Sequence, residues 1–128
     1  MPSCNLIKYK ELDIVYTDIS NASPEEAIAV FDENQIIISK MPHKSVYALV
    51  HAKDARFNSG LIQKIKETVK KNNPYSKATA VSGLNSLSRL MVNSIIAFTG
   101  RQMKLVESPE EGKEWLYKKY KEAAVVTA

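Results

Sequence analysis

Strand-like and helix-like spacings of apolar side chains alternate along this chain. Residues 13–19 mix polar side chains with β-branched and aromatic ones, which predicts a strand, and Leu6–Tyr9 can pair with it as a hairpin. Residues 45–52 form a nearly unbroken apolar run, as expected for a central strand covered on both faces by helices. Residues 77–82 and 103–107 predict two further strands.

The motif Ser-Pro-Glu-Glu occurs twice, at Ser23–Glu26 and at Ser108–Glu111, and each copy precedes a predicted helix. Serine caps the helix, proline at the first helical position loses no hydrogen bond, and the second glutamate reaches back to the cap amide. We expect the first helix to begin at Pro24 and to end near Lys40. The β-branched residues 35–38 resemble a strand, but a strand there would leave a very short helix.

Two more helices are predicted from caps and apolar stripes. Asn58 is a suitable N-cap for a helix that ends at 72–74, and Asn85 or Ser86 caps a helix that ends before Gly100. The second of these has the most buried pattern. The stripe of the first consists of Leu61, Ile62, Ile65 and Val69, and that of the second consists of Leu87, Leu90, Met91, Ile95 and Phe98.

The last predicted helix uses Trp115, Leu116 and Tyr120 for packing, and the tail at 123–128 is expected to fray. Strands and helices therefore alternate along the chain. This order predicts one α/β domain over residues 1–128, with its core at about 13–121 and mobile termini. The expected architecture is a small, mostly parallel sheet of four or five strands with right-handed crossovers.

The composition narrows the class of protein. The chain has 128 residues, 45% of them hydrophobic, which is enough for one continuous core. Cys4 is the only cysteine, which excludes an internal disulfide and a cysteine-rich metal site, and we interpret it as an incidental thiol near a mobile terminus. No signal-peptide pattern and no apolar run of roughly 20 residues is present, so we expect a cytoplasmic protein without a membrane span.

The charge favours anionic partners only slightly. The net charge is +4 and the pI about 9.1. Most of the excess comes from lysines on two amphipathic predicted helices, where a solvated face is the ordinary explanation. Nucleic acid is therefore not expected as a partner, because its recognition needs basic side chains that converge on one face.

Short stretches over most of the chain are similar to one protein family. They are Ile14–Asp18, Ser23–Glu26, Lys44–Val46, Ala55–Asn58, Lys71–Tyr75, Lys77–Val81, Phe98–Arg101 and Glu111–Leu116. Together they resemble the SpoIIAA-like family of small bacterial and archaeal proteins, which is related to STAS domains and often labelled STAS/SEC14-like. The resemblance covers about Asp13 to Leu116 and implies a STAS-like fold. It implies little about activity, because most members look like small cytoplasmic proteins without an assigned one.

In STAS relatives that antagonise anti-sigma factors, Asp-Ser-Ser-Gly-Leu opens the helix after the central strand, and a partner kinase phosphorylates its serine. Residues 57–61 read Phe-Asn-Ser-Gly-Leu at the similar place here. Ser59 and Gly60 match, whereas the acidic residue is missing and Asn58 stands where a serine would. The resemblance therefore makes Ser59 a candidate phosphorylation site, with Asn58, Gly60 and Arg56 around it. The alternative is that Ser59 merely assists Asn58 in capping.

A second candidate site follows from the expected sheet, because parallel sheets bind ligands beyond the carboxyl ends of their strands. His51, Lys53 and Arg56 follow the predicted central strand. The residues after the next strand that complete this candidate site for a phosphate or carboxylate are Ser82, Gly83, Asn85 and Ser86. The same segment is also an ordinary strand-to-helix turn, without P-loop spacing.

Catalytic chemistry is not predicted. Imidazole is a side chain that can act as a general acid or base, and Asp54 could orient that of His51, but no nucleophile can be assigned to the pair. His43 has no clustered carboxylates near it in the sequence, so no metal site is predicted, and no cofactor is expected. Both histidines are expected to be structural or exposed.

Two functional hypotheses remain. The leading one is a non-enzymatic interaction or regulatory module that contacts a protein partner, or a second copy of itself, through the segment that begins at Arg56, with phosphorylation of Ser59 as its switch. The alternative is a binder of a small anionic or amphipathic, lipid-like ligand at the carboxyl ends of the strands. The stripe from Leu87 to Phe98 could line an apolar pocket, although core packing is its commoner role.

Overall fold

Four parallel strands lie side by side in the order in which they follow one another along the chain. The computed structural model describes residues 2–99 and 103–127. In this part of the chain the sheet order is β1-β2-β3-β4-β5; β1 is antiparallel to β2, and the other neighbours are parallel. The strands are β1 (Ser3–Tyr9), β2 (Leu12–Asp18), β3 (Val46–His51), β4 (Ser76–Ser82) and β5 (Met103–Val106), and the helices are α1 (Pro24–Ser39), α2 (Ser59–Asn72), α3 (Ser86–Thr99) and α4 (Pro109–Thr127).

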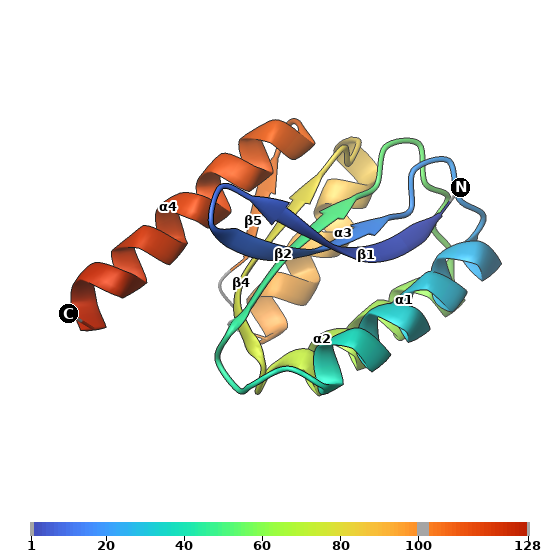
Figure 1. Cartoon of the computed structure of the whole chain (residues 1–128). Helices are drawn as coiled ribbons and strands as arrows, with labels where there is room; N and C mark the ends of the chain where they lie inside the picture. The colour runs from blue at the N-terminus through green and yellow to red at the C-terminus, as the bar shows by residue number, and fades with distance from the viewer. Residues whose placement is uncertain (1, 100–102, 128) are drawn as a thin grey trace.

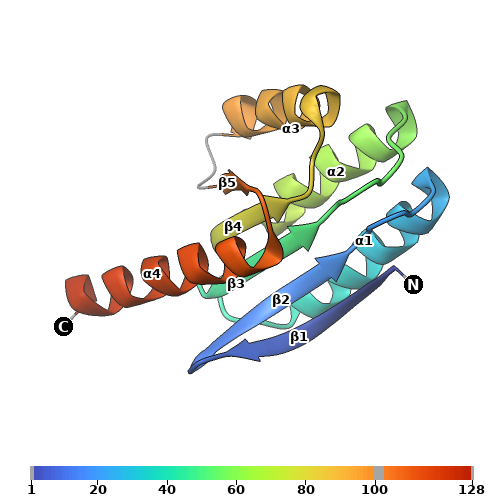
Figure 2. The same cartoon turned by 90° about the horizontal axis from the view of Figure 1, so that it is seen from above.

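The helices divide unequally between the two faces of the sheet. α1, α2 and α3 lie on one face, and α4 alone lies on the other (Figure 1, Figure 2). Each of the first three helices connects one parallel strand to its next neighbour, always toward the β5 edge of the sheet. Because such crossovers all have the same hand, the three helices lie on the same face. The predicted class, a single small α/β domain with a mostly parallel sheet, is confirmed.

The central strand β3 is buried from both sides, as its apolar run predicted. Ala48 packs into the cluster under α1, α2 and α3, whereas Tyr47 and Leu49 pack into the cluster under α4. This alternation follows from the pleat of a strand, which turns successive side chains to opposite faces. It also assigns His51, two residues beyond Leu49, to the α4 face.

The two Ser-Pro-Glu-Glu motifs begin helices but differ in detail. At α1 the capping box is complete, with Glu26 N–H donating to Ser23 Oγ at 3.2 Å and Ser23 N–H to Glu26 Oε1 at 2.9 Å. At α4 the amide of Glu111 donates to Ser108 Oγ, but the Glu111 carboxylate accepts from Glu107 N–H. α1 continues to Ser39, which confirms that residues 35–38 are helical.

Both ends of the described chain are more ordered in secondary structure than expected. The predicted hairpin is present and reaches Ser3, so Cys4 lies in an edge strand, buried against Thr17, and is not an incidental thiol near a mobile terminus. At the other end α4 extends to Thr127, so residues 123–127, which were expected to fray, are helical.

The prediction for α3 was right for Ile95, which is buried, and wrong for the two leucines near the start of the helix. Leu87 and Leu90 are 65% and 69% exposed, although the stripe placed them in the core. The buried residues of the segment 86–97 are Ser88, Val92 and Ile95. The side chain of Phe98 and the predicted terminator Gly100 lie outside the described residues. The two leucines occupy the first turn and a half of the helix, where the sequence offers apolar side chains on more than one side.

A glycine brings α4 close to the sheet. A Cβ placed on Gly112 would lie 2.6 Å from Leu49 Cδ1 and 3.4 Å from both Ala80 Cβ and Val106 Cγ2. Leu49 is fully buried, so its side chain has little room to move away. Gly112 therefore sets the separation between the helix and strands β3, β4 and β5.

Two alanine substitutions at helical glycines should have opposite effects. Gly112→Ala should lower the free energy of unfolding by about 1–3 kcal/mol, because the added methyl overpacks the α4 face. Gly60→Ala is the matched control: its Cβ would meet only Asn58 Oδ1 at 3.5 Å, and reduced chain entropy should raise stability by up to about 1 kcal/mol. Urea denaturation measures both, and a stabilising Gly112→Ala would contradict the close packing.

Candidate functional site

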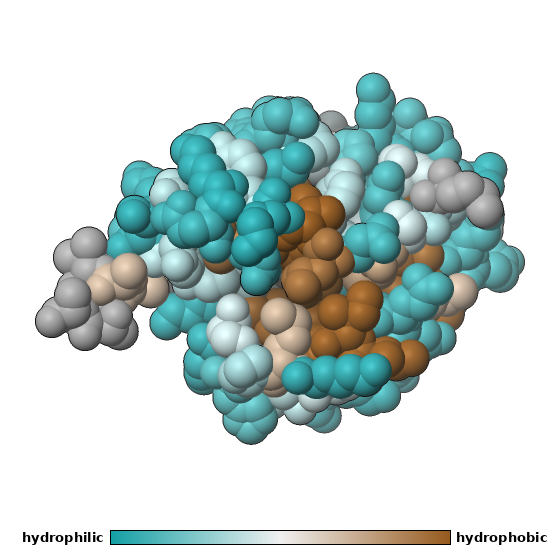
Figure 3. Space-filling model, in the orientation of Figure 1, coloured by the Kyte–Doolittle hydropathy of each residue, from teal (hydrophilic) through white to brown (hydrophobic). Residues whose placement is uncertain are grey.

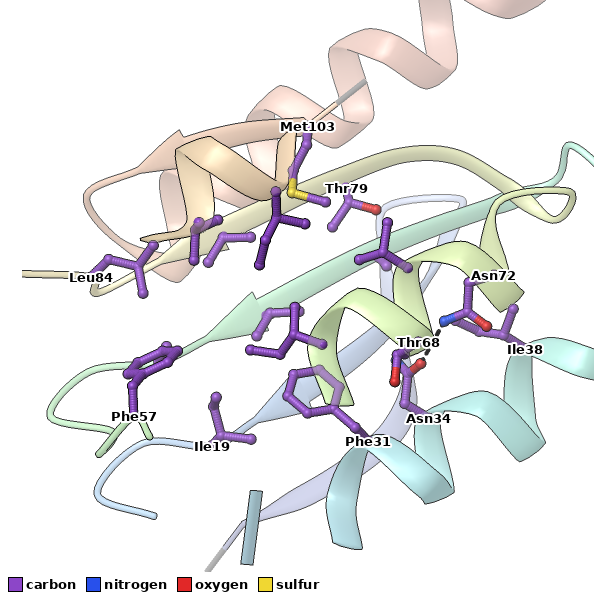
Figure 4. A pocket seen from close by; sticks show the side chains of 18 residues that line it. Ile19, Phe31, Asn34, Ile38, Phe57, Thr68, Asn72, Thr79, Leu84 and Met103 are labelled. Carbon is purple, nitrogen blue, oxygen red and sulfur yellow. Dashed lines mark hydrogen bonds between the residues drawn. The ribbon is translucent and has the colours of Figure 1, made fainter. Parts of the chain in front are cut away.

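A pocket of about 70 Å³ lies inside the domain, between the sheet and the three helices on its α1 face. Figure 4 shows its walls, with α1 and α2 on one side and the strands on the other. The lining residues are Ile19, Phe31, Asn34, Ile38, Ala48, Val50, Ala52, Phe57, Ile65, Thr68, Val69, Asn72, Thr79, Val81, Leu84, Val92, Ile95 and Met103. The pocket thus touches every crossover helix and three of the parallel strands.

The chemistry of the lining is simple. Among the described residues no charged side chain lines the pocket, and the polar ones are all neutral: Asn34, Thr68, Asn72 and Thr79. Asn34 and Asn72 meet at the end of the pocket between α1 and α2 (Figure 4). Small-molecule sites usually share this chemistry, an apolar lining with a few placed polar groups, but are larger, about 300–1,000 Å³.

A chain of buried hydrogen bonds holds the polar end in place. Asn72 Nδ2 donates to Asn34 Oδ1 at 2.9 Å, and Asn34 Nδ2 donates to Thr17 Oγ1 at 3.0 Å. Thr17 Oγ1 in turn lies 3.3 Å from Cys4 Sγ. The relay links α2, α1, β2 and β1. No donor in the described part of the chain reaches Asn72 Oδ1, although this oxygen is buried.

Two residues of the sequence-predicted anion site do come together. His51 Nδ1 lies 2.8 Å from Ser82 Oγ, and the two residues are directly paired across β3 and β4. Ser82 has no exposed surface, so its hydroxyl cannot attack a substrate in this conformation. This contact joins the carboxyl ends of β3 and β4. It lies on the α4 face, which is the side of the sheet opposite the pocket.

Other side chains around this pair were missed by sequence reasoning. Asp18 pairs with His51 in the register of β2 and β3, so Asp18, His51 and Ser82 form one row across three strands. Burial raises the pKa of Tyr16, and the carboxylates of Asp18 and then Glu110 raise it further. In the sequence, Asp18 and Ser82 each stand at or next to the end of a predicted strand, as His51 does. Their alignment in one row depends on the strand register, which only the structure gives.

The remaining members of the predicted anion site are used for other contacts. Asn85 caps α3, since its Oδ1 accepts from Ser88 N–H at 2.9 Å, and Ser86 is exposed as the first helical residue. Arg56 N–H donates to Ala22 O at 3.1 Å, next to the start of α1. Hydrogen bonds with the backbone and side chain of Ser23 lower the pKa of Glu26, and the positive charge of Arg56 lowers this pKa further.

Gly83 and Lys53 meet through their backbones. Gly83 has φ +85°, and a Cβ there would lie 2.7 Å from Lys53 N. Both the positive φ and the close approach require glycine. The Lys53 side chain is exposed. This contact joins the turn after β3 to the turn after β4, beside the His51–Ser82 pair.

The candidate phosphorylation site lies at the start of α2 on the surface. Asn58 is the N-cap, with its Oδ1 accepting from Leu61 N–H at 2.8 Å, as predicted. Ser59 and Gly60 are the first two helical residues, and both are exposed. Because Asn58 caps the helix by itself, Ser59 is not needed for that purpose.

The structure offers no arrangement for metal chemistry or membrane insertion among the residues it describes. No group of three or more histidine, cysteine or acidic side chains in residues 2–99 and 103–127 is placed to hold a metal ion. No helix in the same ranges is both long and apolar enough to cross a bilayer.

His43 packs edge-on against Tyr75, with ring centroids 4.9 Å apart, and Asp54 takes a positive φ of 59° in the turn after β3.

Apolar side chains also reach the surface. Figure 3 shows such a patch between β1 and α1. Leu6 on β1 and Ile36 on α1 are more than half exposed, as are Leu87 and Leu90 on α3. Exposed apolar groups of this size are positions that a partner can cover.

Comparison of the sequence with models of protein families and with curated proteins found no match.

The buried relay makes stability sensitive to alkaline pH. Burial raises the pKa of the Cys4 thiol above its ordinary value of 9.0, so the folded state favours the neutral thiol. The neutral thiol therefore contributes to the free energy of unfolding. This contribution is complete below the pKa of the thiol in the unfolded chain, and it is lost as the pH rises through the pKa of the thiol in the folded state. The free energy of unfolding should fall above pH 9.0. Urea titrations of wild type and Cys4→Ala should show a shallower decline in the variant, and identical slopes would contradict the assignment.

Proposed function

We propose that this chain is a non-enzymatic binding module that takes a small, largely apolar molecule into the pocket between the sheet and α1, α2 and α3. The observation that carries the proposal is the lining, in which every described side chain other than Asn34, Thr68, Asn72 and Thr79 is apolar. The stretches similar to SpoIIAA-like proteins support grouping it with STAS-like modules. The ligand position differs from the strand ends considered first, because the pocket lies within the α1 face.

The volume limits the ligand. A cavity of about 150 Å³ lined by apolar side chains can hold benzene. The pocket here measures about 70 Å³, so it accepts a molecule, or the end of a molecule, with only a few heavy atoms. A longer ligand must displace part of the wall.

α3 is the wall that can be displaced at the smallest cost. In the segment 86–97 it buries only Ser88, Val92 and Ile95, and its exposed leucines contribute no core packing. Its single charged residue, Arg89, forms an ion pair with Glu107 at 3.1 Å, and exposed pairs contribute little to stability. By contrast, α1 and α2 share the Asn34–Asn72 bond and the Asp32–Lys64 ion pair.

Filling the pocket should abolish binding. Ala48 lines it and is buried, so Ala48→Leu places three added carbons in its interior. With 1-butanol as the probe, wild type should show saturable amide shifts in ¹⁵N–¹H spectra at Ala52, Thr68 and Val81, and a raised thermal midpoint. Both responses should disappear in Ala48→Leu.

Ala29→Leu is the matched control, because it adds the same carbons at an exposed position of α1. It should bind 1-butanol as wild type does. Saturable shifts that persist in Ala48→Leu, or that are absent in wild type, would contradict the proposal. Native mass spectrometry of the protein purified from its own host should also show a retained small molecule.

A second candidate function, a phosphorylation-dependent contact at Ser59, is favoured by one observation. Ser59 is exposed at the first position of α2, and the first turn of this helix carries no acidic side chain. A phosphate there would face free amides and the positive end of the helix dipole. The added charge would change the surface that begins at Arg56 without disturbing the cap at Asn58.

Phosphopeptide mapping of the protein from its own host tests this second function. We expect phosphate on Ser59 and none on Ser86, which is the matched control because it is also exposed and also the first residue of a helix. Ser59→Asp should raise the free energy of unfolding by about 0.3–1 kcal/mol relative to Ser59→Ala at low salt. Modification of both serines, or of neither in growing and starved cells, would count against a specific switch.

A further inference from the structure

β1 is an edge strand whose outer side is open. It pairs with β2 residue for residue from Ser3 to Tyr9, and in the described part of the chain no strand lies on its other side. The strand contains no proline, and its continuous register leaves it without a bulge. Both devices commonly keep an edge from pairing with another chain. The opposite edge strand, β5, has only four residues. β1 is therefore the better template for a further strand.

The middle of β1 is apolar and uncovered on the α1 face. Cys4 packs into the cluster on that face, and the pleat of the strand turns Leu6 and Lys8 to the same side. Leu6 is 52% exposed. Figure 3 shows the apolar surface that continues from β1 toward α1. A partner strand laid along β1 would cover Leu6 and bond the open backbone groups.

The geometry of an antiparallel pair limits how β1 can meet a second copy of itself. Directly opposite residues of such a pair share one face, so a strand paired across a two-fold axis must place one residue opposite itself. Leu6 is the midpoint of Ser3–Tyr9, and only its register pairs all residues of the strand. In this register Leu6 meets Leu6, and Lys8 of each copy lies opposite Cys4 of the other.

The charges around this strand are consistent with the same register. Burial raises the pKa of the Cys4 thiol, and the negative charge of Glu33 raises it further, so this exposed carboxylate of α1 lies near Cys4. Lys8 Nζ lies 3.0 Å from Asp13 Oδ1 of its own chain, and an ammonium group has further donors for a second carboxylate. A lysine often prevents an edge from pairing. Here Lys8 of one copy would instead meet Glu33 of the other.

We infer that two copies of this chain associate by antiparallel pairing of β1 with β1, centred on Leu6, which joins their sheets into one continuous sheet. The two-fold axis keeps both α1 helices on the same face, next to each other, because α1 packs against β1 and β2. Ile37, one turn after Glu33 and only partly buried, gains cover there. No residue of β1 is among the described lining of the pocket, so this dimer is independent of the proposed function.

Sedimentation of the full chain measures the association. We expect a reversible monomer–dimer equilibrium with a dissociation constant on the order of 10 µM, since one strand pair and one helix contact make a small interface. Leu6→Lys places two ammonium groups opposite one another and should leave only monomer. Leu90→Lys is the matched control at an even more exposed leucine, on α3, and should dimerise as wild type does.

Three outcomes of this experiment would overturn the inference. They are a wild type that stays monomeric up to about 1 mM, a dimer that Leu6→Lys leaves intact, and a dimer that Leu90→Lys abolishes.

Single cysteines test the register. In a Cys4→Ser background, Leu6→Cys places two Cβ atoms about 4.5–5.5 Å apart, close enough for a disulfide under oxidation. Lys8→Cys is the matched control, because the two copies of position 8 lie four residues apart along the strands, about 13 Å, too far to be bridged. We expect a covalent dimer from Leu6→Cys alone. Cross-linking at position 8 as fast as at position 6, or at neither, rejects this pairing, and the result decides even if Leu6→Lys does not fold.

Charge reversal tests the contact between Lys8 and Glu33. Glu33→Lys replaces two symmetric attractions by repulsions and should raise the dissociation constant of the dimer about 3- to 30-fold, and adding Lys8→Glu should recover most of that loss. Glu67→Lys makes the same change at an exposed position of α2 and should leave the dissociation constant as in wild type. Equal weakening by Glu33→Lys and Glu67→Lys would indicate a general charge effect and argue against this contact.

Discussion

The arrangement of this domain depends on one topological constraint: the parallel strands lie in the sheet in their chain order. Each crossover then advances in the same direction, so the three crossover helices share one face, and α4, which follows the last strand, packs on the other. The crowded face contains the pocket, where α1, α2 and α3 converge over β3 and β4. On the α4 face, Gly112 allows the helix to approach the strands closely.

Polar groups inside the α1 face give that packing its specificity. The relay from Cys4 through Thr17 and Asn34 to Asn72 joins two strands and two helices with directional bonds. Apolar surfaces alone would allow α1 and α2 to slide over one another at little cost, whereas displaced amides would lose their partners in a buried environment. The relay therefore fixes the end of the pocket formed by α1 and α2, and α3 is left as its least anchored wall.

The two candidate sites lie on opposite sides of the central strand. His51 and Ser82 close the carboxyl ends of β3 and β4 on the α4 face, while Ala48 and Val50 line the pocket on the other. The residues grouped from the sequence as an anion site are divided accordingly, with His51 and Ser82 in contact at the strand ends. Arg56 and Asn85 belong to the starts of helices on the α1 face, where they make backbone and capping contacts.

Local signals in the sequence determined the elements themselves. The cap at Asn58, the Ser-Pro-Glu-Glu motifs, the apolar run of β3 and the alternation of strands and helices are short-range features, and the energies behind them act within a few residues. They were sufficient for the fold class. What only the tertiary structure decided was how distant residues meet: Leu87 and Leu90 face outward, Cys4 is buried, Ser82 bonds His51, and Asn72 lies in the pocket beside Asn34. These depend on strand register and on the rotation of helices against the sheet, which long-range packing sets and no local pattern records.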